Sequence, residues 1–129
     1  MKKLLIPLLL ISTISFGQAR LGYTKGQLID DYESSRTKHE IMTLDDNIEC
    51  VYTKLTSGSY IYHYFDKNTH LSTSAAFMFV DKLTKAQIIK TCNEKYTKIG
   101  KNHWQWQTMD ISLRINEKEG YEYFWFYTR

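Results

Sequence analysis

Aromatic side chains that alternate along predicted strands are the residues whose types and spacing best fit a binding surface. Residues two apart in a strand lie on the same face of a sheet. The set comprises Tyr60, Tyr62, Tyr64, Tyr121, Tyr123 and Trp125, together with Trp104 and Trp106. Tyrosine and tryptophan offer a large rigid area with a polar end, which suits protein interfaces, and their ring faces also stack on sugars. The alternative is a structural role, in which cross-strand tyrosine pairs stabilise the sheet by about 0.2–1 kcal/mol each.

Signatures of catalysis and metal binding are missing from the sequence. The histidines are His39, His63, His70 and His103, and no third zinc ligand stands at a suitable spacing from them. Neither a G-x-S-x-G motif nor a glycine-rich phosphate loop occurs. Asp110 is unusual as a carboxylate inside a predicted strand, and a cleft that joined it to a histidine would favour an enzyme. We therefore expect no catalytic residue, no metal and no cofactor, and enzymatic activity is the less favoured alternative.

Two cysteines, Cys50 and Cys92, leave two alternatives open. In an exported protein they could form a disulfide between a strand and a helix, worth roughly 4 kcal/mol in the chain-entropy model. Strand-to-helix geometry often holds the α-carbons too far apart for a bridge, which favours two buried free thiols.

The N-terminal residues have the pattern of a secretory signal. Lys2 and Lys3 precede an apolar stretch, Leu4 to Phe16, that is short for a membrane span, and small residues at Ser15 and Gly17 suit cleavage before Gln18. We expect residues 1–17 to be a cleaved signal peptide and residues 18–129 to be a single α+β domain, periplasmic or secreted, without stable membrane insertion. A retained N-terminal anchor is the alternative.

The charge of the remaining chain does not favour a nucleic-acid partner. The formal net charge of +3 falls to about +1 without the two signal lysines. The basic residues are scattered among acidic ones, with no stripe that could neutralise a row of phosphates.

Two helices are predicted from similar starting sequences. Over Leu83 to Gly100, Thr84 and Gln87 fit a capping box and Gly100 fits the residue that ends a helix. The helix predicted from Thr24 to about Ser35 begins in the same way, because T-K-G-Q-L-I at 24–29 echoes T-K-A-Q-I-I at 84–89. The echo has two explanations: constrained capping chemistry, or a tandem helix-plus-strands repeat.

Alternating and β-branched stretches predict strands over 40–44, 48–55, 60–65, 70–80, 103–115 and 121–127. In the strand predicted over 103–115, the apolar residues change from even to odd positions near Gln107 and Thr108, which a bulge would explain. The fold class is α+β, with two helices packed on one face of an antiparallel sheet of about five to six strands. The more apolar side chains of each strand should face the helices, which leaves the tyrosine-rich side open.

The stretch Leu21-Gly22-Tyr23-Thr24-Lys25-Gly26-Gln27-Leu28 resembles the G-x-T-x-x-Q-[VL] helix start of small envelope proteins of the SmpA/OmlA outer-membrane-assembly type and of β-lactamase-inhibitor-like domains. Leu83 to Ile88 repeats the pattern without its glycine. The chain departs from the family in having no L-G-x-P after the first helix and no lipid-attachment cysteine. The resemblance implies helices on an antiparallel sheet and a non-enzymatic protein-binding module.

The residues and the resemblance together predict an exported, non-enzymatic binding module that engages another protein through its aromatic sheet face. Two alternatives remain: a carbohydrate-contacting or hydrolytic envelope protein, and a structural component of envelope assembly.

Overall fold

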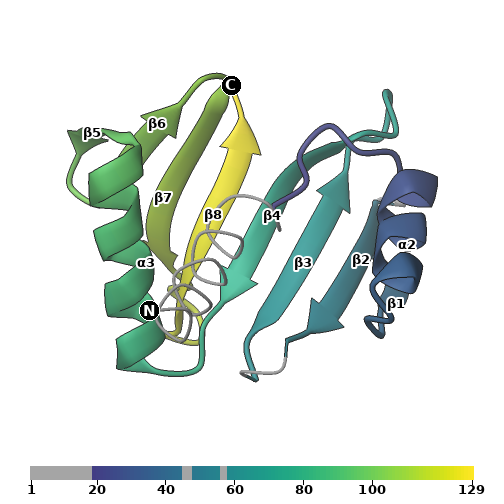
Figure 1. Cartoon of the computed structure of the whole chain (residues 1–129), viewed down its shortest axis with the longest axis horizontal. Helices are drawn as coiled ribbons and strands as arrows, with labels where there is room; N and C mark the ends of the chain where they lie inside the picture. The colour runs from purple at the N-terminus through teal and green to yellow at the C-terminus, as the bar shows by residue number, and fades with distance from the viewer. Residues whose placement is uncertain (1–18, 45–47, 56–57) are drawn as a thin grey trace, which may run out of the picture.

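One antiparallel sheet of eight strands carries the two helices of the described chain (Figure 1). The computed structural model describes residues 19–44, 48–55 and 58–129; the expected signal peptide lies outside them. The elements are α2 (Lys25–Ser34), β1 (Glu40–Thr43), β2 (Glu49–Lys54), β3 (Tyr60–Phe65), β4 (Ser72–Met78), α3 (Lys82–Lys95), β5 (Thr97–Gly100), β6 (His103–Trp106), β7 (Met109–Ile115) and β8 (Glu122–Thr128). One helix followed by four strands thus occurs twice.

The two halves join at the centre of the sheet. The strand order is β1-β2-β3-β4-β8-β7-β6-β5, so the last strands of the halves pair with each other. This junction places Phe77 opposite Phe124 and Ala76 opposite Trp125. The edge strands β1 and β5 lie at opposite ends (Figure 1).

The register shows which face the helices cover. A row of directly paired residues crosses six strands and is buried throughout: Val51, His63, Ala75, Phe126, Ile111 and Trp104. Leu28 and Tyr32 of α2 pack on Val51 and Phe65, and Ile88 and Cys92 of α3 belong to the larger cluster around Phe77, Trp104 and Phe124. Both helices therefore pack on the same face, because the residues that they contact share one parity.

The start of α2 matches its prediction and the start of α3 does not. Thr24 caps α2 in a complete capping box with Gln27. At α3 the N-cap is Asp81, whose carboxylate accepts a hydrogen bond from the Thr84 backbone N–H at 2.7 Å. The expected Thr84–Gln87 box was therefore wrong, because an acceptor three residues earlier satisfies that N–H.

The sheet has eight strands, not the five to six expected, for two reasons. The predicted helix to Gly100 ends at Lys95, because Tyr96 is extended (φ −119°, ψ 162°), and Thr97–Gly100 form β5. The predicted strand over 103–115 is a hairpin, in which Gln107 (φ 52°) and Thr108 form the turn between β6 and β7. A hairpin also explains the change of parity: Trp106 pairs with Met109, so both share the covered face.

Candidate functional site

The face of the sheet that the helices leave open carries a continuous group of aromatic rings. We call it the open-face layer; its members are Tyr52 of β2, Tyr60, Tyr62 and Tyr64 of β3, Tyr121 just before β8, and Tyr123, Trp125 and Tyr127 of β8. All except Tyr121 are half-buried, and Tyr121 is exposed. Register explains the grouping: Tyr52 lies opposite Tyr62, Tyr62 opposite Ala76, and Ala76 opposite Trp125.

The small side chains of β4 allow rings from both halves to meet. Ala76 is 2% exposed although it lies on the open face, because the rings of neighbouring strands cover it. Tyr64 of β3 and Trp125 of β8 meet with ring centroids 5.6 Å apart. The layer thus spans the junction between the halves.

The rings contact one another in two geometries. Tyr62 stacks on Tyr52 with centroids 5.1 Å apart and on Tyr60 with centroids 6.2 Å apart. Trp125 and Tyr123 meet edge to face at an interplanar angle of 90°. Both arrangements match the preferred offset and T-shaped geometries of aromatic pairs. Much of the ring area is consequently directed at other rings.

Two cations border the layer. The Arg114 guanidinium lies over Trp125 at 5.8 Å and over Tyr127 at 5.4 Å from the ring centroids, and the Lys54 ammonium lies 5.9 Å from the centroid of Tyr60. Such contacts hold a cation beside aromatic area that a partner could cover.

The phenols of Tyr62 and Tyr64 stay protonated at physiological pH. Burial raises the pKa of Tyr64, and the nearby Cys50, Tyr62, Tyr121 and Tyr123 raise it further. Burial likewise raises the pKa of Tyr62. These two hydroxyls are therefore available as neutral donors and acceptors.

Trp104 and Trp106 do not belong to this surface. Trp104 is 0% exposed on the helix-covered face and donates from Nε1 to Asn93 Oδ1 of α3 at 2.8 Å. Trp106, half-buried on the same face, contacts Tyr96 edge to face. The expected open-face position of the two tryptophans is wrong, because residues 103–115 form a hairpin in which Trp106 pairs with Met109, and not one strand. Conversely, the expected set lacks Tyr52 and Tyr127, which also lie on the open face. Tyr127 is two residues from Trp125 in the same strand, and this spacing places both rings on one face.

Asp110 does meet a histidine on the open face. The Asp110 side chain is 8% exposed, with Oδ2 3.2 Å from His103 Nε2 and Oδ1 3.3 Å from Arg129 Nε. Tyr127 Oη lies 3.5 Å from the same His103 Nε2. A relay needs both imidazole nitrogens, one held by the carboxylate and one directed at the nucleophile. Because one nitrogen contacts both groups, this cluster lacks that arrangement.

A buried polar cluster fixes α2 to the covered face. His63 is 0% exposed, and its Nε2 lies 2.5 Å from Tyr32 Oη. Arg20 lies over the Tyr32 ring at 4.8 Å from the centroid and donates from Nε to Asp31 at 2.5 Å. Burial lowers the pKa of His63 to about 3, and the charge of Arg20 adds to the effect. The cluster holds the helix through the buried side chains of Tyr32 and His63.

No protein-family model, curated protein or solved structure matches this chain. In the described ranges, no three potential ligands gather into a metal site, and no helix has the length and apolarity to cross a bilayer.

The two cysteines are free and lie on opposite sides of the sheet. Cys50 pairs with Tyr64 on the open face, whereas Cys92 belongs to the core beneath α3. Burial raises the pKa of Cys50 to about 11 and that of Cys92 to about 12. Of the two alternatives, the structure has two buried thiols, and both are protonated at neutral pH.

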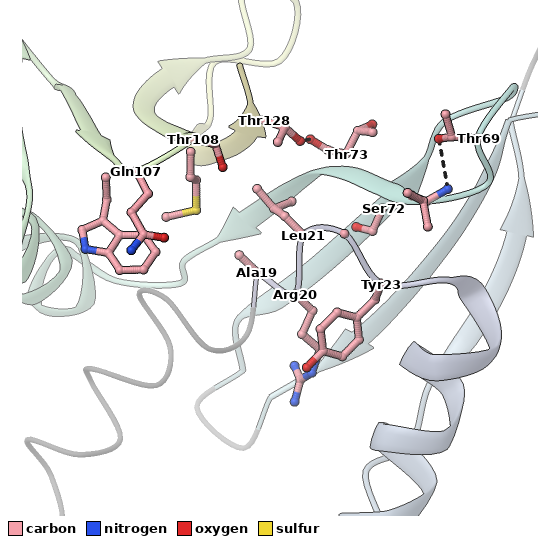
Figure 2. A pocket seen from close by; sticks show the side chains of 14 residues that line it. Ala19, Arg20, Leu21, Tyr23, Thr69, Ser72, Thr73, Gln107, Thr108 and Thr128 are labelled. Carbon is pink, nitrogen blue, oxygen red and sulfur yellow. Dashed lines mark hydrogen bonds between the residues drawn. The ribbon is translucent and has the colours of Figure 1, made fainter.

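A pocket of about 620 Å³ opens on the helix-covered side (Figure 2). The segment before α2 forms one wall with Ala19 and Leu21, and the β6–β7 turn forms another with Gln107 and Thr108. Arg20 is the charged residue of the lining, and Asp31 and Tyr32 already engage its guanidinium. Apart from Arg20, whose charge is already paired with Asp31, the pocket lining is uncharged, and the open-face layer is the stronger candidate site.

Proposed function

We propose that this chain is an exported binding module and that the open-face layer is the surface on which it engages a protein partner. The observation that carries the proposal is the gathering of partly accessible tyrosine and tryptophan rings from both halves on the one face without a helix. Tyrosine, tryptophan and arginine are enriched at the centres of protein interfaces. Arg114, set against Trp125, completes that composition.

The ring geometry favours a protein over a sugar. A sugar ring stacks on an accessible aromatic face. Tyr62, however, has ring contacts with Tyr52 and Tyr60 at interplanar angles of 23° and 27°. Rings that cover one another offer edges and hydroxyls, which suit the mixed apolar and hydrogen-bonding contacts of a protein interface.

Export and the tandem origin of the halves form part of the same proposal. The N-terminal signal pattern supports a periplasmic or secreted location. The repeated order of one helix and four strands supports a helix-plus-strands duplication and is compatible with the resemblance to the SmpA/OmlA and β-lactamase-inhibitor-like families. A module of this kind has no need of a cofactor.

Affinity capture from an envelope extract tests the proposal with paired variants. We expect the double variant Tyr62→Ser and Tyr123→Ser to weaken capture of the main partner by at least about tenfold, the scale of an interface hot spot. The control is Tyr23→Ser, which removes a tyrosine 37% exposed, the same as Tyr121, but beside α2. Equal loss with the control, or capture abolished by free monosaccharide, would contradict protein binding by the open-face layer.

A further inference from the structure

The two edges of the sheet differ in how well they are protected from pairing with another strand. An edge strand presents unpaired N–H and C=O groups, and proteins commonly block such edges with lysines and bulges. β5 follows this pattern: its pairing with β6 shifts register between Lys98 and Gly100, and Lys98 and Lys101 flank the irregularity.

β1 lacks these features. It pairs with β2 in regular register over all four residues. Ile41 is 48% exposed and Met42 is 37% exposed, one on each face of the sheet. Its one charged side chain, Glu40, is engaged by the hydroxyl of Tyr52. β1 is thus a regular edge with two exposed apolar side chains and, within the strand itself, neither a lysine nor a bulge.

The hairpin fixes which backbone groups of β1 point outward. The Leu44 N–H donates to the Ile48 carbonyl at 2.7 Å, so this pair is a hydrogen-bonded one. Hydrogen-bonded and non-hydrogen-bonded pairs alternate in an antiparallel ladder. Glu40 and Met42 therefore direct their backbone groups at β2, whereas Ile41 and Thr43 direct theirs away from the sheet.

We propose that two copies of this chain associate through antiparallel pairing of their β1 strands. In the register centred on Met42, Ile41 of each copy pairs with Thr43 of the other, and both pairs use the outward backbone groups. Met42 then lies opposite Met42 of the second copy as a non-hydrogen-bonded pair, the closer of the two pair types. One strand serves both sides, as a two-fold symmetric interface requires.

The faces of the sheet fit this arrangement. The two-fold axis of an antiparallel pair is perpendicular to the sheet, so both helix-covered faces lie on one side and both open-face layers on the other. Ile41 belongs to the helix-covered face, yet it is 48% exposed, so α2 leaves its surroundings accessible. The result is a continuous sheet of two copies with one extended aromatic surface.

A cysteine placed at the axis tests the register. Met42→Cys should form an intermolecular disulfide, because the α-carbons of a non-hydrogen-bonded antiparallel pair lie about 4.5 Å apart, within the range of disulfides. The control is Ile99→Cys on the other edge strand, where the exposed fraction of the isoleucine is 47%. The test uses the protein as it is isolated from the cells that produce it. The two native cysteines are buried and should not react. Absence of the Met42→Cys dimer, or equal cross-linking through Ile99→Cys, overturns the proposed register.

Sedimentation equilibrium tests the association itself. We expect a concentration-dependent dimer that Ile41→Lys converts to a monomer and that Ile99→Lys leaves intact. Far-ultraviolet circular dichroism checks whether each variant is folded. If Ile41→Lys does not fold, the Met42→Cys disulfide still tests the association independently. A native chain that stays monomeric up to about 1 mM, where even an association of about 4 kcal/mol would appear, refutes the proposal. A dimer insensitive to Ile41→Lys also refutes it, since another surface would then hold the copies together.

Discussion

Lowering the pH from 7 to 5 should reduce the free energy of unfolding through one residue, His63. This imidazole is 0% exposed beneath α2, against Tyr32 and close to Arg20. Burial lowers its pKa from 6.5 to about 3, so the folded protein keeps the ring neutral at pH 5. The unfolded chain, with an ordinary histidine pKa of about 6.5, binds the proton. Because the unfolded state binds more protons between these two pKa values, stability falls as the pH drops below 6.5.

The size of the effect follows from the two pKa values. At pH 5 the loss is about 1.5 pH units multiplied by 1.36 kcal/mol, or about 2 kcal/mol. The folded pKa of about 3 lies well below pH 5, so the loss at that pH is set almost entirely by the unfolded chain. The loss is a large fraction of the stability of an ordinary domain.

Urea unfolding at pH 7 and pH 5 measures this loss in the native chain and in His63→Gln, whose amide keeps a hydrogen-bonding group beside Tyr32. The variant should lose about 2 kcal/mol less than the native chain over this pH interval. His70→Gln, which removes an exposed imidazole, is the control with which His63→Gln is compared. A nuclear magnetic resonance titration of the native chain gives a second readout. A His63 ring signal that moves with a midpoint near 6.5 would show that the ring is not held neutral and would refute the reasoning.

Two further predictions concern the helix starts and the thiols. Thr24→Ala and Asp81→Ala should each lower the free energy of unfolding, measured by urea titration, by about 1 kcal/mol, because each removes an N-cap acceptor. Gln87→Ala should change it by less than about 0.5 kcal/mol, because Asp81 and not Gln87 caps α3. Cys50 and Cys92 should react with a disulfide reagent only after unfolding, with both thiols then titrating without a reductant; one or no reactive thiol would contradict the free cysteines of the structure.

Local alternation predicted much of the sheet, because burial on one side imposes a period of two. The strand Tyr60–Phe65 has the bounds expected from its tyrosines, and the apolar phase does face the helices. The capping box at Thr24 was likewise legible, since its hydrogen bonds join residues three apart.

Other features depend on contacts that no local pattern records. The turn at Gln107 and Thr108 has neither glycine nor asparagine, so positive φ at Gln107 left no compositional signal. Tyr96 continues an apolar helical stripe, but it adopts an extended conformation and contacts Trp106. The contact between Tyr64 and Trp125 follows from the pairing of β4 with β8. The alternation of residues within a strand does not predict which strand will pair with it.

The mirrored strand order has a consequence for how the chain folds. Apart from the β4–β8 pairing, every ladder joins strands that are neighbours in sequence. Loops between such strands close quickly, whereas the central pairing must bring together segments with the whole of α3 and three strands between them. Each half can form its meander from local encounters, so the central closure should limit the folding rate. Substitutions at Phe77 or Phe124 should then act chiefly on the speed of folding, because these residues face each other across the pairing that forms in the rate-limiting step.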